Sequence, residues 1–229
     1  IVSNSLITAS GDCAVIQDLP SAPQFQSTIL TGNPGGNGIE INGGTLSASN
    51  RWRAMDAPFV ITADVTVAGG VTLTVDPGCV VKFSNGPACS DYAGLFVSGT
   101  LNAVGTASAP INFTSLWDDG VGGDTNNDGA GSVPAAGNWE RIQFAASSVG
   151  SQMVYCTVRY GGRTARYQYN ACADTYNPMI DIINSSPTFD HCTFSNAWTT
   201  IANAANSANV SFQYSCFSTS VRTTCGVSG

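Results

Sequence analysis

The amino-acid sequence predicts an all-β protein that folds as a parallel β-helix, a solenoid of short strands wound around one axis. Short apolar runs alternate with period two, and Gly, Pro, Asn and Asp separate them. No stretch shows the 3.6-residue period of a helix. The runs recur about every 30 residues, which is the length of one solenoid turn built from three short strands.

Composition agrees with a folded, strand-rich protein. Of the 229 residues, 43% are hydrophobic and only 10% are charged, which excludes disorder of the highly charged kind. All acidic residues except Glu40 and Glu140 are Asp, which forms turns rather than helices. The net charge is −7 and Lys82 is the single lysine, so nucleic acid is not expected as a partner. No run of 18 or more apolar residues occurs, so no membrane span is expected.

The elements can be placed in order along the chain. Residues 1–38 match no repeat, and we expect them to form a non-repeating N-terminal arm or cap. The β-helix domain is expected over 39–229, with inserted loops near 116–136 and 161–178. The clearest alternating runs lie at 65–67, 71–75, 81–83, 95–97, 111–113 and 142–144. A β-sandwich is the alternative, but it requires hairpins with two-residue turns.

Two sets of recurring residues indicate which strands stack. Phe83, Phe113 and Phe144 each end an apolar-x-Phe run, at separations of 30 and 31 residues. Further along, the pattern Met153-x-x-Cys156-x-Val158 is echoed by Phe189-x-x-Cys192-x-Phe194 and by Phe212-x-x-Ser215-x-Phe217. Repeated columns of this kind favour strands that lie in register with their copies one coil away.

One part of the chain carries a resemblance to a known family. It begins Pro58-Phe59-Val60-Ile61-Thr62-Ala63-Asp64-Val65-Thr66-Val67 and continues Gly70-Val71-Thr72-Leu73-Thr74-Val75-Asp76-Pro77-Gly78. Similar coils follow at 95–106, 110–115, 137–144 and 186–196. Over about 58–217 the chain resembles bacterial secreted right-handed parallel β-helix repeat proteins. The resemblance implies a right-handed coil, but that family holds lyases, hydrolases and adhesins, so it does not fix a function.

The strongest local motif lies between two coils. Asp124-x-Asn126-x-Asp128-Gly129 matches the first half of a calcium loop, in which alternate oxygen ligands converge on one cation and the glycine turns the chain. The twelfth position of such a loop is normally Glu, and here it is Ala135. Any missing carboxylate must therefore come from elsewhere in the chain.

Asp118 and Asp119 are the nearest candidates for that carboxylate. Four carboxylates within eleven residues, with no basic partner in the sequence, would repel one another without a cation. We therefore expect a structural Ca²⁺ held by Asp118, Asp119, Asp124, Asn126 and Asp128. The alternative is a metal-free polar loop of Asx-turns.

A second segment is a candidate for ligand recognition. Arg159, Arg163 and Arg166 alternate with tyrosines, among them Tyr167 and Tyr169. Arg and Tyr in this pattern can stack on sugar rings, which makes cell-surface or matrix glycans a possible class of partner. The alternative is a self-packed loop in which each Arg stacks on its own Tyr.

The cysteines indicate an oxidising compartment. Their number, eight, is even, and none forms a C-x-x-C pair, which favours disulfides over zinc or redox motifs. Cys79–Cys89 and Cys216–Cys225 would each close a short loop between strand-like segments. A secreted, extracellular or cell-surface protein is therefore expected.

Two functions from different classes remain open at this point. The leading hypothesis is a non-enzymatic extracellular structural module, braced by calcium and disulfides and able to associate head-to-tail through its open ends. The alternative is a polysaccharide lyase or glycoside hydrolase that uses Asp181, Asp190 and the single histidine, His191.

Overall fold

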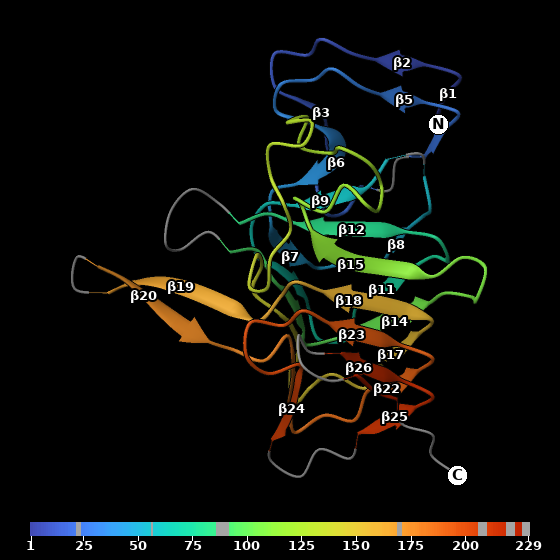
Figure 1. The fold of residues 1–229 in the computed structure, drawn as a ribbon. Helices are drawn as coiled ribbons and strands as arrows, with labels where there is room; N and C mark the ends of the chain where they lie inside the picture. The colour runs from blue at the N-terminus through green and yellow to red at the C-terminus, as the bar shows by residue number, and fades with distance from the viewer. Residues whose placement is uncertain are drawn as a thin grey trace.

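A computed structural model describes residues 1–21, 24–55, 57–85, 92–168, 171–205, 210–218 and 223–225. All of the regular elements in these ranges are strands. They wind as a right-handed parallel β-helix with three faces, each a parallel sheet that runs along the solenoid axis (Figure 1). The predicted fold class is confirmed.

Each turn of the solenoid adds one strand to each of the three sheets. Sheet I contains β7 (Gly44–Leu46), β10 (Val65–Val67), β13 (Leu95–Val97), β16 (Ile142–Phe144), β21 (Ile180–Ile183) and β24 (Ala202–Ala205). Sheet II contains β8 (Asn50–Trp52), β11 (Thr72–Val75), β14 (Thr100–Val104), β17 (Gln152–Val154), β22 (Thr188–Asp190) and β25 (Ser211–Gln213).

Sheet III is the longest of the three. It contains β3 (Cys13–Ile16), β6 (Gly36–Ile41), β9 (Phe59–Ile61), β12 (Val80–Phe83), β15 (Ile111–Ser115), β18 (Cys156–Arg159), β23 (Thr193–Ser195), β26 (Cys216–Ser218) and β27 (Thr223–Cys225). All of its pairings are parallel except that of β27, which lies antiparallel to β26 and covers the edge of the sheet at that end.

The core is a set of inward-facing columns that run from coil to coil. In sheet III one column is Ile39, Phe59, Val81, Phe113, Val158, Phe194 and Phe217. Its members from Ile39 to Phe194 are at most 2% exposed. Alternation places every second side chain of a strand in this interior, and the removal of that apolar surface from water is the main force that stabilises the fold.

The second of the two predicted repeats is confirmed and the first is wrong. Met153 pairs with Phe189, and Phe189 with Phe212, as the echoed pattern requires. Phe113, by contrast, lies opposite Val81 rather than Phe83, and Phe144 belongs to sheet I. The turns between strands differ in length from coil to coil, so equal spacing in the sequence does not guarantee equal position in the coil.

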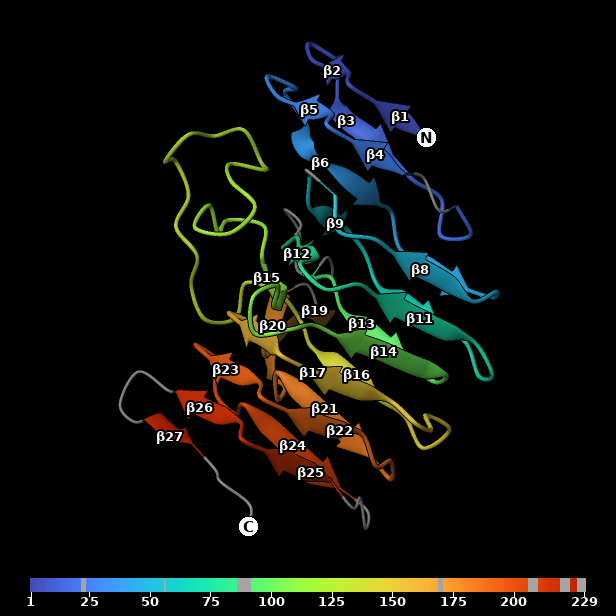
Figure 2. The same ribbon diagram turned by 90° about the vertical axis from the view of Figure 1, so that its right-hand side faces the viewer.

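Residues 1–38 wind in the same sense as the rest of the chain (Figure 2). β1 (Val2–Ser3) pairs with β4 (Phe25–Gln26), β2 (Leu6–Ile7) pairs with β5 (Ile29–Leu30), and β3 pairs with β6, all in parallel. They therefore form coils at the N-terminal end of the solenoid rather than a detached arm. Most of these strands are only two residues long, too short to reveal an alternating pattern in the sequence.

Two longer connections leave the solenoid. The segment between β15 and β16 forms a loop beside sheet III (Figure 2). The second connection, between β18 and β21, forms the antiparallel hairpin β19 (Arg163–Gln168) and β20 (Ala171–Tyr176), which projects from the side of the solenoid (Figure 1). The two segments lie where inserted loops were expected.

The turns between sheets I and II supply a test of the coil spacing. A Cβ atom added at Gly99 would collide with the backbone carbonyl oxygens of Val71 and Ala68 in the neighbouring coil, whereas one added at Gly69 would meet nothing closer than 3.9 Å. We expect Gly99→Ala to lower the free energy of unfolding by about 3 kcal/mol, because the two coils must move apart. The matched control Gly69→Ala should change it by less than about 0.5 kcal/mol. Urea denaturation of both variants measures the difference, and equal stabilities would contradict the packing.

Candidate metal centre

The candidate site is built on the outward-facing column of sheet III. Glu40 lies opposite Val60, Val60 opposite Lys82, and Lys82 opposite Thr114. Arg159 of β18 follows, with its Nε 3.4 Å from Thr114 Oγ1. An outward face of a sheet normally meets solvent, yet Lys82 and Thr114 are both 0% exposed. The loop that follows β15 covers this column.

The loop is fixed to the sheet first by an ion pair. Arg159 Nη2 lies 2.6 Å from Asp118 Oδ2, and Arg159 Nε donates to the same oxygen at 2.8 Å. Thr114 Oγ1 also donates to Asp118 Oδ2. Asp118 is 4% exposed, and this charge-assisted set compensates for its burial. The expectation that the loop carboxylates lack a basic partner is therefore wrong, and Asp118 is engaged away from the predicted ligand set.

Lys82 provides the second attachment. Its Nζ donates to the backbone carbonyl of Gly123 at 2.7 Å. Burial lowers the pKa of Lys82 to about 8, and the nearby carboxylates of Asp119, Asp118 and Asp124 oppose that shift. A positive charge beneath the loop reduces the repulsion among its carboxylates.

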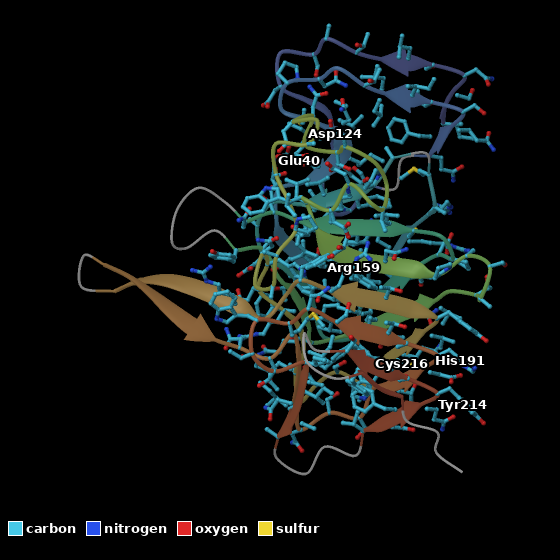
Figure 3. All side chains as sticks on the ribbon, in the orientation of Figure 1. Glu40, Asp124, Arg159, His191, Tyr214 and Cys216 are labelled. Carbon is cyan, nitrogen blue, oxygen red and sulfur yellow. The ribbon has the colours of Figure 1, made fainter. Side chains whose placement is uncertain are left out.

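A third attachment joins the loop to the N-terminal coils. Asn37 of β6 donates its backbone N–H to the carbonyl of Thr125 at 2.6 Å. Its side-chain amide donates to the Asp124 carbonyl and to Asn127 Oδ1, each at 3.3 Å. Figure 3 labels Asp124 at the level of strand β6, which also contains Glu40, and Arg159 on a later coil. The loop therefore bridges several coils of sheet III.

Three of the predicted ligands converge within this loop. One carboxylate oxygen from each of Asp119, Asp124 and Asp128 lies within 4.8 Å of the others. The Asp124 carboxylate accepts the backbone N–H groups of Asp128 at 3.0 Å and Gly129 at 2.9 Å, which fixes the turn. Asn126 donates its amide to Asp128 Oδ2 at 2.8 Å. The two carboxylates of the alternating motif thus converge with that of Asp119, as a cation site requires.

Two oxygens of the cluster have no hydrogen-bond partner in the described part of the chain. These are Asp119 Oδ1 and Asn126 Oδ1, and both are shielded from solvent. Buried acceptors of this kind are costly unless something compensates for them. Burial, followed by the charge of Asp124, raises the pKa of Asp119, and the positive charge of Lys82 opposes that shift. The atoms available as metal ligands are all oxygens, a set that suits a hard cation such as Ca²⁺.

Arg159 and Arg163, the two predicted recognition residues whose side chains are described, make separate contacts. Arg159 lies in the ion pair under the loop. Arg163 stacks instead on two aromatic rings, 4.8 Å from the centroid of Trp198 and 5.5 Å from that of Tyr92. The side chains of Arg166 and Tyr167, and the whole of Tyr169, lie outside the described residues. A glycan-binding role for this segment stays a prediction.

The cysteines differ from expectation at one position. Cys79 is a buried free thiol whose Sγ lies 3.3 Å from the carbonyl of Trp52, so the predicted Cys79–Cys89 bridge is not formed. The thiol occupies an inward-facing core position directly before β12, and Cys89 lies outside the described residues. Cys216 is disulfide-bonded and lies opposite Cys225 in the β26–β27 register. The side chain of Cys225 is not among those described, so the Cys216–Cys225 pair stays a prediction.

The carboxylates of the enzymatic alternative are on different sheets. Asp181 belongs to β21 of sheet I, is 8% exposed, and accepts a hydrogen bond from Gln143 Nε2 at 2.8 Å. Asp190 belongs to β22 of sheet II and lies 2.7 Å from His191 Nδ1. The two carboxylates therefore do not share the face that an acid–base pair would need.

The sequence analysis missed an aromatic column at the turn between sheets II and III. Tyr155, His191 and Tyr214 occupy equivalent positions and have φ values of 47°, 51° and 45°, a region that bulky residues rarely adopt. The His191 ring stacks 4.5 Å from Tyr155 and 4.9 Å from Tyr214 between centroids. Each residue directly precedes the middle position of the echoed pattern, which is the signal that locates the column.

Comparisons with known proteins leave the family open. No family model and no solved structure matches the chain. Over 94 residues, 41% of the chain, it is 29% identical to protein bark beetle of Drosophila melanogaster. The chain spans about 3% of the length of that curated relative. Within the described ranges, the fold contains no helix with the length and apolar character needed to cross a membrane.

Lys82 makes a testable contribution to the dependence of stability on pH. Its pKa is lowered from 10.5 to about 8, so between these values the unfolded chain holds a proton that folded Lys82 has lost. The free energy of unfolding of the wild type, minus that of Lys82→Met, should therefore rise from pH 8 to 10.5 by on the order of 3 kcal/mol. Taking the difference cancels the titration of the cysteines. Denaturation series in a chelator measure it, and a difference that stays constant with pH would contradict the burial of a charged lysine.

Proposed function

We propose that this protein is a non-enzymatic extracellular structural module, a β-helix whose outer loop is fixed by Ca²⁺. The observation that carries the proposal is the oxygen cluster of Asp119, Asp124 and Asp128 above the buried Lys82. Asp119 Oδ1 and Asn126 Oδ1 add two buried acceptors that await a positive partner.

The formal charges of the loop and the sheet beneath it support a divalent ion. Asp118, Asp119, Asp124 and Asp128 carry four negative charges, and Lys82 and Arg159 supply two positive charges from the sheet side. Two negative charges remain, on the side of the loop away from the ion pair. One Ca²⁺ balances them and accepts the oxygens that no protein donor reaches.

The proposed ligands are Asp119, Asp124, Asn126 and Asp128, without Asp118. Asp118 directs Oδ2 to Arg159 and Thr114, and it serves to hold the loop on sheet III. Each ionised carboxylate offers about four lone-pair sites, so Asp124 can bind a cation and still accept its two backbone hydrogen bonds. Water completes the coordination of such a site, since Ca²⁺ takes six to eight oxygens.

The role of the ion is structural, because the loop that would hold it covers the column of Glu40, Lys82 and Thr114 on sheet III. Removal of the ion leaves like charges unbalanced over a buried lysine, which loosens the cover. The extracellular location is supported by the even number of cysteines and by the disulfide at Cys216.

Chelation tests the calcium site. Ca²⁺ that binds only the folded chain adds about 2.7 kcal/mol at a hundredfold excess over Kd, or a Tm rise of about 5–10 °C for a chain of this size. We expect the wild type to melt that much lower in EDTA, and Asp119→Asn with Asp128→Asn to abolish the difference. The control Asp190→Asn, at a partly exposed site on sheet II, should keep it. If the wild type has the same Tm in calcium and in EDTA, the calcium site is wrong.

Head-to-tail association of the modules is the proposed mode of interaction between copies. Leu6 lies opposite Ile29 in the N-terminal coils, and these side chains are 60% and 62% exposed. Ile16 of β3 is 58% exposed nearby in the same coils. Apolar side chains next to strand edges favour contact with another chain.

Sedimentation velocity at increasing concentration measures this association. Leu6→Asp with Ile29→Asp should shift the protein toward the monomer, because charge is placed on the contact surface. The control Val149→Asp, a 72% exposed residue of a turn between sheets I and II, should leave the distribution unchanged. A wild-type protein that stays monomeric throughout would rule out association through these residues.

A further inference from the structure

Two of the described free thiols are stacked on each other in the core. Thr157 of β18 lies opposite Thr193 of β23, so the residues immediately before them, Cys156 and Cys192, are neighbours in adjacent coils. Both are 1% exposed. Cys156 Sγ donates to the carbonyl of Ala103 at 3.5 Å, and Cys192 Sγ donates to that of Met153 at 3.2 Å. Neighbouring strands lie about 4.8 Å apart, within the Cα separation that a disulfide spans.

The other two described free thiols have no such neighbour. Val80 pairs with Asn112, so Cys79 lies opposite Ile111. Ile111 in turn pairs with Cys156, so it separates the two cysteines in this column. Cys13 Sγ donates to the carbonyl of Val15 at 3.8 Å, within its own strand β3. Proximity therefore selects one pair among the four.

We propose that Cys156 and Cys192 form an intramolecular disulfide that joins two neighbouring coils when the protein folds in oxidising surroundings. The inference deepens the proposed extracellular function, because such surroundings supply the oxidant, but it does not depend on the calcium site. The structure describes the dithiol form of the pair.

The chemistry is thiol–disulfide exchange with a small disulfide such as oxidised glutathione. The Cys192 thiolate attacks one glutathione sulfur, forms a mixed disulfide and releases one glutathione thiol. The Cys156 thiolate then attacks the Cys192 sulfur and releases the second. The cysteines lose two electrons and two protons, and glutathione gains them as two thiols.

Burial sets the time at which this exchange can occur. Cys156 and Cys192 are each 1% exposed in the folded protein, so the exchange occurs while the last coils are still closing. Once formed, the bond is shielded from external reductants.

The disulfide would close the chain from residue 156 to residue 192, which includes the β19–β20 hairpin. That hairpin interrupts the regular return of the chain to sheet I. A cross-link across its two ends restricts the unfolded chain and holds the coils on either side together. In the chain-entropy picture this raises Tm by on the order of 10 °C.

Peptide mapping tests the pairing directly. The full-length protein is reduced in denaturant, refolded in a reduced and oxidised glutathione buffer, and checked for the circular dichroism of native sheet. Free thiols are then alkylated with iodoacetamide in denaturant. Chymotryptic cleavage after Tyr155, Tyr160, Phe189, Phe194, Tyr214 and Phe217 separates Cys156, Cys192 and Cys216 into different peptides.

We expect the 156–160 and 190–194 peptides to be joined by a disulfide, while the peptide that contains Cys79 is alkylated. Alkylated Cys156 and Cys192 in the refolded protein, or a bond from either one to another cysteine, would overturn the proposal. Cys192→Ser should reduce the difference in Tm between the oxidised and reduced protein to the part that the disulfide at Cys216 contributes, and the matched core variant Cys79→Ser should retain the full difference. Neither outcome bears on the chelation experiment, so failure here leaves the calcium proposal standing.

Discussion

Every other feature of this protein depends on the stacking of one coil on the next. A single coil cannot bury its own apolar side chains, so each inward residue must pack on its counterpart one strand away. The register that follows is strict, because a slip of one residue would turn the whole inward column to solvent. The same register fixes the outward column, and so it brings Lys82, Thr114 and Arg159 together although they are far apart in the sequence.

The outward column in turn explains the loop that covers it. A lysine with no exposed surface requires a cover that carries acceptors, and the loop after β15 supplies the Gly123 carbonyl and several carboxylates. The carboxylates exceed the positive charge that the sheet provides, and two of the loop's oxygens remain without donors. The proposed cation would thus compensate for the charge that is buried between the loop and the outer face of sheet III.

The sequence predicted the parts of this arrangement that are local. Alternation located the strands from residue 65 onward, and the D-x-N-x-D-G spacing located Asp124 and Asp128, two of the three carboxylates that converge. It did not predict that Arg159 neutralises Asp118, because that contact depends on how many residues each turn contains. The equivalence of Phe83 and Phe113 failed for the same reason, and the two-residue strands of the N-terminal coils were too short to show a period.

Strand β18 links the two stabilising devices proposed for this fold. Its inward residue Cys156 stacks on Cys192, and its outward residue Arg159 binds Asp118 of the loop that follows β15. Arg159 can hold the loop only if β18 keeps its position in sheet III. The β19–β20 hairpin follows β18 directly, so the chain does not pass from β18 to sheet I by a short turn. A disulfide from Cys156 to Cys192, which directly precedes β23, would fix β18 to the next coil from inside the core. The interior cross-link and the exterior cation would then act on opposite faces of one strand, each limiting the motion that weakens the other.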